Sequence, residues 1–351
     1  MIYLTILLVA FFETGGGYWA RHWESKWWIL LMALALHVSE KIGDRTHWSV
    51  ALVCLSTLFS AVWSMGFHGP EVNPFTPLDP AQVYAAVAGF SFLLGATALA
   101  WSSASDLEFV RRALAFAGQA NAGMILIQVA IYKPHNFFGG FIGNPSMAAC
   151  FSAMTLPLWF SPLAAVLPAL ACIASQTSMG AGVLAAVLAS QFLFKHRSML
   201  GALVAVIIAL GSAWAIRGHS FFHTSGRFNM WTLAWNFWDA QRLPMSGLGL
   251  GATPSFTPGA QKIAGMGLEL FPFLHNDFLQ TLIEQGWIGL TCWLVMFAFV
   301  LVRSRKTPWL MASVVGWSVT AIGNYPAHLA MPALTGAFLV AQAFHQKGGQ
   351  K

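Results

Sequence analysis

Charged residues are scarce in this chain, and acidic residues are the scarcest. Asp and Glu together number 12 and Lys and Arg 18 among 351 residues, so only 9% of the chain is charged whereas 57% is hydrophobic. A soluble globular protein carries about 25% charged residues, so this composition excludes that class. Long apolar runs separated by short polar gaps predict an all-α, polytopic helical membrane protein instead.

Other absences narrow the class further. No ten-residue segments of alternating polarity occur, which excludes a β-barrel. The four cysteines stand singly in apolar runs without Cys-x-x-Cys spacing, so we expect them in the core. The net charge of +6 comes from basic residues at helix ends, and no basic stripe with interleaved aromatics exists. The expected partner is therefore the lipid bilayer and not nucleic acid.

The apolar runs predict about twelve membrane helices of roughly twenty residues each. The first run lacks a basic n-region and a cleavage site, so we interpret it as a membrane helix and not as a signal peptide. The pair around "LWFSPLAAV" could instead form one re-entrant hairpin. The predicted spans are 2–20, 27–43, 47–66, 82–103, 109–131, 146–160, 162–176, 179–194, 199–216, 278–302, 308–322 and 328–345.

The basic residues predict the orientation of these helices. With the N-terminus in the cytoplasm, eleven of them fall on the cytoplasmic side and seven on the other. Four of those seven lie in one long loop, where the positive-inside rule is weak. Both termini are therefore expected in the cytoplasm. The eleven are Lys41, Arg45, Arg111, Arg112, Lys195, Arg197, Arg303, Arg305, Lys306, Lys347 and Lys351.

The long loop, residues 217–277, is the only long polar segment of what we interpret as a single integral membrane domain, 1–351. Loops held by a rigid scaffold often carry the chemistry of a protein. Within this loop, "RFNMWTLAWNFWDAQ" (227–241) places Trp231, Trp235 and Trp238 near one face of a helix. This spacing predicts an amphipathic helix that lies along the membrane surface.

Four segments with distinctive residues follow one another along the chain. They are "GGFIGNPSMAACFSAMTLPL" (139–158), "SGRFNMWTLAWNFW" (225–238), "LPMSGLGLG" (243–251) and "HNDFLQTLIEQGWIGL" (275–290). In this order, around one large loop, they resemble the O-antigen ligase/polymerase superfamily, and "GNYPAHLAMPALTGAFLV" (323–340) is similar to its last helices. Each motif is weak alone, but the combination is specific. The resemblance covers roughly residues 135–345.

This resemblance implies a membrane glycosyltransferase that takes its glycan from an undecaprenyl-diphosphate-linked donor. The active site would face the periplasm from the bacterial inner membrane. Transfer would be inverting and independent of metal and cofactor, and the sequence contains no DxD or HExxH pattern. The site needs cations or amides on the diphosphate and a hydrogen-bond or proton acceptor at the attacking hydroxyl.

The chain departs from the family pattern at one place. The family has a Ser-Arg-Gly turn before its eighth helix, whereas this chain has "SQTSMGAGV" with Met179 at the position of the arginine. Either Arg217 or Lys133 replaces that charge, or the donor is bound differently.

The catalytic candidates lie around the last motif. His275 is the candidate at the acceptor hydroxyl, because an imidazole can take a proton near neutral pH; the alternative is an interfacial histidine at a helix end. Glu284 is an intramembrane carboxylate, for which we favour pairing with an arginine over acid catalysis. Asn276 and Asp277 are suited to cap the following helix, with Asn276 in a supporting role.

The donor-binding candidates are cations and helix ends. Arg227 is the first choice, because a guanidinium binds phosphate oxygens bidentately, although an interfacial arginine is the alternative. Arg217 and Arg242 are further candidates. Asn144, before Pro145, opens a helix whose positive end suits an anion. Gly249 lies in a flexible turn whose amides could approach a phosphate.

Two histidines, His219 and His223, have the spacing of a metal pair but lack a third ligand, so no metal is predicted.

The sequence does not identify the molecule that accepts the glycan. Lipid A–core, as in a ligase, is the first choice; another lipid-linked glycan, as in a polymerase, or a protein hydroxyl are the alternatives. A transporter or flippase is the alternative from another class. Transporters place ionisable residues at mid-membrane in paired halves, whereas here the charges concentrate in one loop and no halves correspond, which favours the enzyme.

Overall fold

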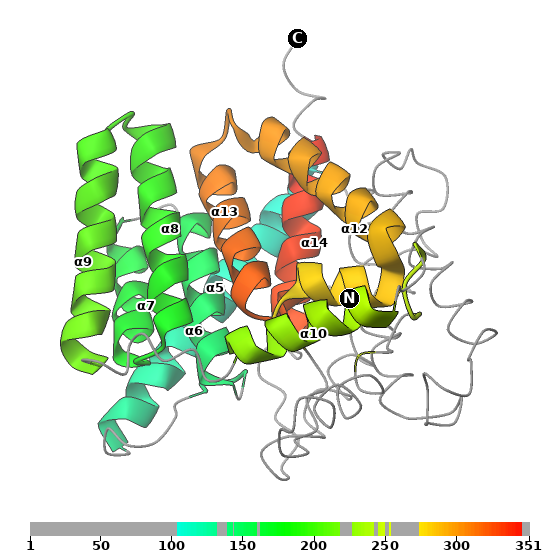
Figure 1. Ribbon diagram of the computed structural model, residues 1–351. Coiled ribbons are helices and arrows are strands. Elements are labelled where there is room, and N and C mark those ends of the chain that lie inside the picture. Colours follow the sequence, from blue (N-terminus) through cyan, green and yellow to red (C-terminus); the bar gives the residue numbers. More distant parts are fainter. Residues whose placement is uncertain are drawn as a thin grey trace.

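The structure, a computed structural model, describes residues 104–131, 139–142, 144–159, 162–217, 227–241, 245–249, 253 and 274–345. Within these residues all regular structure is helical (Figure 1), which confirms the predicted all-α class. The four spans predicted before residue 104, and with them the count of twelve, lie outside the described residues.

All eight spans predicted from residue 109 onward are present as helices, with ends that differ by a few residues. The segment 227–241 is a helix as well, as predicted, while its amphipathic character and its place along the membrane surface stay predictions. The elements are α5 (Ala104–Ile131), α6 (Pro145–Thr155), η1 (Leu156–Leu158), α7 (Pro162–Ala174), α8 (Ser178–Lys195), α9 (Met199–Arg217), α10 (Arg227–Gln241), α12 (Asp277–Ser304), α13 (Pro308–Gly323), η3 (Pro326–His328) and α14 (Ala330–His345).

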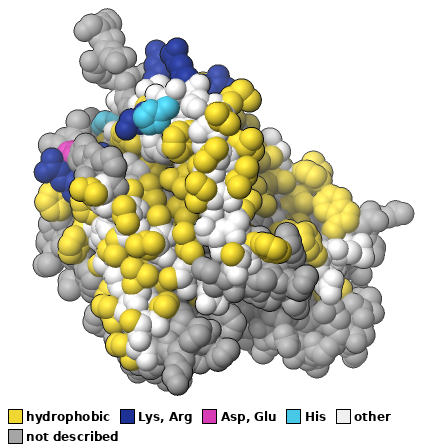
Figure 2. All heavy atoms as spheres, turned by 90° about the vertical axis from the view of Figure 1, so that its left-hand side faces the viewer, with side chains coloured by type: hydrophobic (Ala, Val, Ile, Leu, Met, Phe, Trp, Pro, Cys, Tyr) yellow, Lys and Arg dark blue, Asp and Glu magenta, His cyan; other side chains and the backbone are white. Residues whose placement is uncertain are grey.

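Three of the described helices are long and apolar enough to cross a membrane: Leu107–Ile131, Ser178–Lys195 and Asp277–Ser304. Shorter apolar helices accompany them. The face of the molecule formed by α8 and α9 is largely apolar, with Lys, Arg and His gathered at one end (Figure 2). Outward side chains of α9 such as Leu200 and Ile207 are exposed. An apolar band with charge confined to its end is typical of a surface that faces lipid.

Helix α6 lies at the centre of the described bundle, in contact with α5, α7, α8 and α13. Every residue from Met147 to Thr155 is buried, so this helix has neighbours on all sides. The core around it is closed by large side chains, among them Phe151, Trp317 and Phe338. Because α6 is enclosed, the residue that precedes it, Asn144, is held at one end of the bundle, where it is half-buried.

Helix α12 is kinked, where the sequence predicted one continuous span over 278–302. Gly286 has φ 68° and ψ −168°, outside the helical range. Before it, Asp277–Gln285 lies beside α10; after it, the helix runs along α13 and α14 (Figure 1). The carbonyl groups of Ile283 and Glu284 accept hydrogen bonds from the amides of Leu248 (2.9 Å) and Gly249 (2.8 Å). The loop thus pairs backbone groups near the kink.

The end of the bundle far from α10 is the basic end. Of the Lys and Arg residues that the structure describes, all but Arg217 and Arg227 lie there. They are Arg111, Arg112, Lys195, Arg197, Arg303, Arg305 and Lys306.

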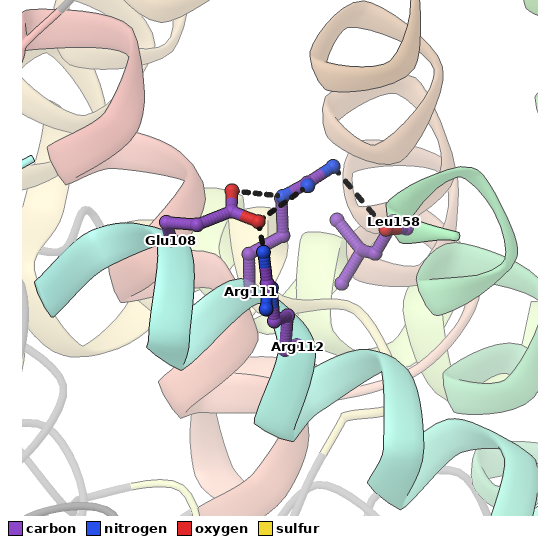
Figure 3. A network of polar contacts seen from close by, with 4 residues as sticks. All are labelled: Glu108, Arg111, Arg112 and Leu158. Atoms are coloured by element: carbon purple, nitrogen blue, oxygen red, sulfur yellow. Dashed lines mark hydrogen bonds and ion pairs between the residues drawn. The ribbon is translucent and has the colours of Figure 1, made fainter. Parts of the chain in front are cut away.

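One of these arginines, Arg111, is buried and contacts residues of three elements (Figure 3). It binds both carboxylate oxygens of Glu108 at 2.8 Å and donates to the Leu158 carbonyl at 3.4 Å. Its guanidinium also lies 5.2 Å from the ring centroid of Trp309. These contacts join α5, η1 and α13 at the basic end, and the polar groups discussed next lie at the other end.

Candidate active site

Four segments that are distant in the sequence meet at the end of the bundle opposite the basic end. They are the start of α6, the start of α10, the residue before the N-cap of α12, and the break between α13 and η3. We call their polar side chains the polar cluster. Its members are Asn144, Arg227, His275, Asn324 and Tyr325. The contacts described below show that the structure brings together three of the residues proposed from the sequence.

Arg227 is the first residue of α10. Its Nη1 donates to the carbonyl oxygen of Gly323, the last residue of α13, at 2.8 Å. Within the described residues this bond uses one of the five N–H donors of the guanidinium. Burial lowers the pKa of Arg227 from its ordinary value, while Cys150 and Tyr325 act in the opposite direction. The side chain still carries its charge at neutral pH. It is therefore a cation whose remaining N–H groups can bind a ligand.

His275 lies directly before α12 and has a left-handed backbone, with φ 52°. Its ring meets that of Tyr325 edge-on, with 4.8 Å between the centroids. Burial, and then the charge of Arg227, lower the pKa of His275 to about 4, whereas Asn324 acts to raise it. The imidazole is therefore neutral at pH 7. Its buried Nδ1 has no hydrogen-bond partner among the described residues.

Asn324 and Tyr325 were not singled out as site residues from the sequence. Asn324 follows α13 and is fully buried. Its Nδ2 donates to the Ser146 hydroxyl at 2.9 Å and lies 3.8 Å from the Cys150 sulfur, while its Oδ1 has no partner among the described residues. Burial raises the pKa of Tyr325. The sequence feature that could have pointed to these two residues is the polar segment "GNYP", which interrupts two apolar runs.

Asn144 opens α6, as its position predicted, and it also bonds to Tyr325, which was not predicted. Its Oδ1 caps α6 by accepting from the Met147 amide at 3.1 Å, and its Nδ2 donates to the Tyr325 hydroxyl at 3.3 Å. The capping bond places the positive end of α6 at the polar cluster. A role in anion binding stays a prediction.

The residues after His275 fix the start of α12. Asn276 is its N-cap, with Oδ1 accepting from the Leu279 amide at 3.0 Å, as the sequence favoured. Asp277 accepts from the Ala327 amide at 2.9 Å and so joins α12 to η3. Together these bonds hold His275 against the segment that carries Asn324 and Tyr325.

Glu284 lies further along α12 and makes other contacts. Its Oε1 accepts from the Thr253 hydroxyl at 2.6 Å and from the Gln280 amide at 3.1 Å. Since Gly249 binds the Glu284 carbonyl, both residues join the 245–253 segment to the kinked helix. The catalytic role of Glu284, its pairing with an arginine, and a phosphate contact by Gly249 stay predictions.

Met179 stands in the first turn of α8, where the family pattern places an arginine. Its thioether lies against Gly323: a Cβ added to that glycine would be 2.4 Å from the Met179 sulfur. Because the Gly323 carbonyl binds Arg227, position 179 borders the polar cluster. Arg217 ends α9 at the same end of the bundle (Figure 1), but its side chain is outside the description.

The remaining candidates lie outside the described residues. They are Arg242, Lys133, His219 and His223.

A family model described as O-antigen ligase matches residues 163–294, from α7 into the second half of α12. The matched range includes Arg227, His275 and Glu284. No curated protein matches the chain. The match supports the family predicted from the sequence motifs: over residues 163–294 the chain is similar to the O-antigen ligase/polymerase superfamily.

Proposed function

We propose that this membrane protein is a glycosyltransferase that moves a glycan from an undecaprenyl-diphosphate-linked donor to an acceptor hydroxyl at the polar cluster. The observation that carries the proposal is the pair formed by His275 and Arg227. A neutral imidazole with an unpartnered Nδ1 lies close enough to a guanidinium for that charge to lower its pKa. A proton acceptor beside a phosphate-binding cation is what such a displacement requires.

The reaction proceeds by one displacement. The acceptor oxygen attacks the anomeric carbon of the donor glycan, and the bond from that carbon to the diphosphate oxygen breaks with inversion. The hydroxyl proton passes to His275, and undecaprenyl diphosphate leaves with its new negative charge stabilised by Arg227. Although a base with a pKa of about 4 is weak, the hydroxyl proton becomes strongly acidic as the new bond forms. Bound diphosphate also opposes the effect of Arg227 on the pKa of His275.

Transfer requires no divalent metal in this proposal, because Arg227 and the positive ends of α6, α10 and α12 supply the positive charge. The site faces the periplasm from the bacterial inner membrane, and the basic end faces the cytoplasm, in keeping with the positive-inside rule.

Lipid A–core is the first choice of acceptor, which makes the protein an O-antigen ligase. A polysaccharide polymerase and a protein O-oligosaccharyltransferase are the alternatives within the superfamily. A transporter or flippase remains the alternative of another class; it would bind the donor without cleaving it.

The test compares purified variants in transfer and in donor binding. His275→Ala should lower turnover by about 10²–10⁴-fold with donor binding nearly unchanged. Arg227→Ala should weaken donor binding as well as turnover, and Arg227→Lys should recover only part because the bidentate fork is lost. Arg112→Ala, which removes an exposed arginine at the basic end, is the matched control.

Wild-type turnover by His275→Ala would remove the histidine from the chemical step. Loss of transfer in EDTA with recovery in Mg²⁺ would contradict the metal-independent mechanism. The choice between ligase and polymerase follows from complementation of strains that lack one or the other, scored by the banding of their lipopolysaccharide.

A further inference from the structure

Asn324 is a fully buried amide whose nitrogen is bound and whose oxygen is available. Its Nδ2 donates to the Ser146 hydroxyl at 2.9 Å and lies 3.8 Å from the Cys150 sulfur, both on α6. Its Oδ1 makes no hydrogen bond of ordinary geometry within the described residues. Because an amide is planar, with oxygen and nitrogen diverging from one carbon, Oδ1 points away from Ser146. An amide oxygen can only accept a hydrogen bond, so its partner must be a donor.

The donor next to this oxygen is the imidazole of His275. A side-chain hydrogen bond with Asn324 acts to raise the pKa of His275. An acceptor has this effect because it stabilises the ring in which both nitrogens carry protons, whereas a donor has the opposite effect. Asn324 therefore meets the ring through Oδ1, in agreement with the bond between its Nδ2 and Ser146. The bond to His275 is loose, as catalytic hydrogen bonds often are until the substrate binds.

Neighbouring contacts keep the imidazole beside Asn324. Asp277 accepts from the Ala327 amide at 2.9 Å and so fixes the start of α12 against η3. The ring of Tyr325, the residue after Asn324, meets the imidazole edge-on with 4.8 Å between the centroids. The two side chains thus belong to segments that are held together on both sides of their contact.

A fixed acceptor beside a neutral imidazole decides where the proton of the ring lies. The neutral ring has one proton for two nitrogens, and the nitrogen without it is the base. Asn324 Oδ1 favours the tautomer whose N–H points toward Asn324, which leaves the lone pair on the other nitrogen. When that nitrogen takes a proton, the ring becomes a cation and its bond to Oδ1 becomes stronger.

We propose that Asn324 is the positioning residue of His275: it accepts a hydrogen bond from one ring nitrogen and thereby leaves the other nitrogen to take the proton of the attacking hydroxyl. This inference rests on the proposed function and deepens it. Asn324 touches neither the donor nor the acceptor and acts through the histidine. The bonds formed and broken are those of the proposed displacement, and the proton moves to the nitrogen that faces away from Asn324.

The first experiment reads the imidazole directly and does not depend on transfer. Purified full-length protein is labelled with ¹⁵N-histidine, and the His275 resonances are assigned by their loss in His275→Gln. At pH 7 the wild type should show one neutral tautomer, and Asn324→Ala should show a mixture of the two. Asn324→Asp, whose carboxylate accepts more strongly, should keep the single tautomer and raise the pKa of His275.

The second experiment measures turnover against pH. Asn324→Ala should lower kcat about 10- to 100-fold with the KM of the donor nearly unchanged. It should also move the acid limb of kcat/KM downward, because a contact that raises the pKa of His275 is lost. Asn324→Asp should recover part of kcat and move the limb upward.

The other titratable groups around the imidazole stay in place in both variants. They are Arg227 on α10, Tyr325 before η3, Asp277 on α12 and Cys150 on α6.

Asn121→Ala and Asn121→Asp are the matched controls. Asn121 is another buried asparagine, and its Nδ2 donates to the Ser152 hydroxyl and the Ala148 carbonyl of α6, each at 2.9 Å. These variants remove or charge a buried amide on α6 outside the polar cluster. They should leave the tautomer and the pKa of His275 as in the wild type, whatever their effect on stability.

The inference and the proposed function fail differently. A mixture of tautomers in the wild type overturns the inference, and so does a pKa of His275 that Asn324→Asp leaves unchanged. Both readings remain decisive if Asn324→Ala does not fold. A single tautomer that responds to Asn324→Asp, in a protein that transfers glycan to no acceptor, would uphold the contact and contradict the proposed function.

Discussion

At the scale of single residues, the proximity of Arg227 and His275 predicts an unusual pH profile. Since the pKa of His275 is lowered to about 4 from 6.5, kcat/KM should be flat from neutral pH down to about pH 5 and fall only near pH 4. The groups that act on this imidazole are Arg227, Tyr325 and Asn324. Arg227→Gln removes the charge, so the acid limb should move upward. A wild-type limb near pH 6.5 would contradict the assignment.

The same shift predicts how stability depends on pH. The folded pKa of His275 is below the unfolded one, so below pH 6.5 the unfolded chain binds a proton that the folded protein does not bind until about pH 4. Stability is therefore lost as pH falls from 6.5 to 4. His275→Gln should flatten this dependence in thermal unfolding, and an unchanged slope would count against a buried neutral imidazole.

The sequence predicted part of the site and not the rest. His275, Arg227 and Asn144 could be chosen because their chemistry is recognisable within short motifs. Asn324 could not, because its place in the polar cluster depends on a bond to Ser146, 178 positions away in the sequence. Nor does any local pattern predict that position 179, where a methionine replaces the expected arginine, lies against Gly323.

At the scale of the helix, the kink in α12 predicts a severe effect of Gly286→Ala. A Cβ at this position would lie 1.9 Å from the Met245 carbonyl oxygen, and φ is left-handed. Strain and overpacking together should destabilise the fold by about 2–5 kcal/mol. The matched control is Gly182→Ala, in the second turn of α8, where a Cβ has nothing within 4 Å.

Thermal unfolding in detergent, followed by a transfer assay, tests this prediction. Gly182→Ala should melt at or above the wild-type temperature, because alanine favours a helix. If Gly286→Ala melts with the wild type, α12 does not need its kink.

Helices as elements were predictable, and the kink was not. Hydrophobic run length located the described α-helices other than α10, because a helix in lipid satisfies its backbone polar groups with its own hydrogen bonds. Helix α10 was located by the spacing of its tryptophans. Gly286, by contrast, stands inside a span predicted as one helix, and an isolated glycine is tolerated within a helix. The amides that bind the carbonyls near the kink come from residues 248 and 249, far back in the sequence.

At the scale of the whole molecule, the separation of the basic end from the polar cluster predicts its orientation. In a cysteine-free variant, a cysteine at exposed Asn229 of α10 should react with a membrane-impermeant maleimide applied from the periplasmic side. A cysteine at exposed His196, between α8 and α9, should react only after the membrane is opened. The reverse pattern would invert the orientation.

The kink at Gly286 also determines the depth at which chemistry takes place. The straight part that follows it, residues 287–304, is about 27 Å long at 1.5 Å per residue, close to the ~30 Å of hydrocarbon in a bilayer. The preceding turns, and His275 with them, then lie level with the phosphate groups of one leaflet. The lipid-linked donor of the proposed function would arrive in that leaflet by lateral diffusion with its diphosphate already at this level. One helical turn added to or removed from this straight part would shift the match by about 5.4 Å.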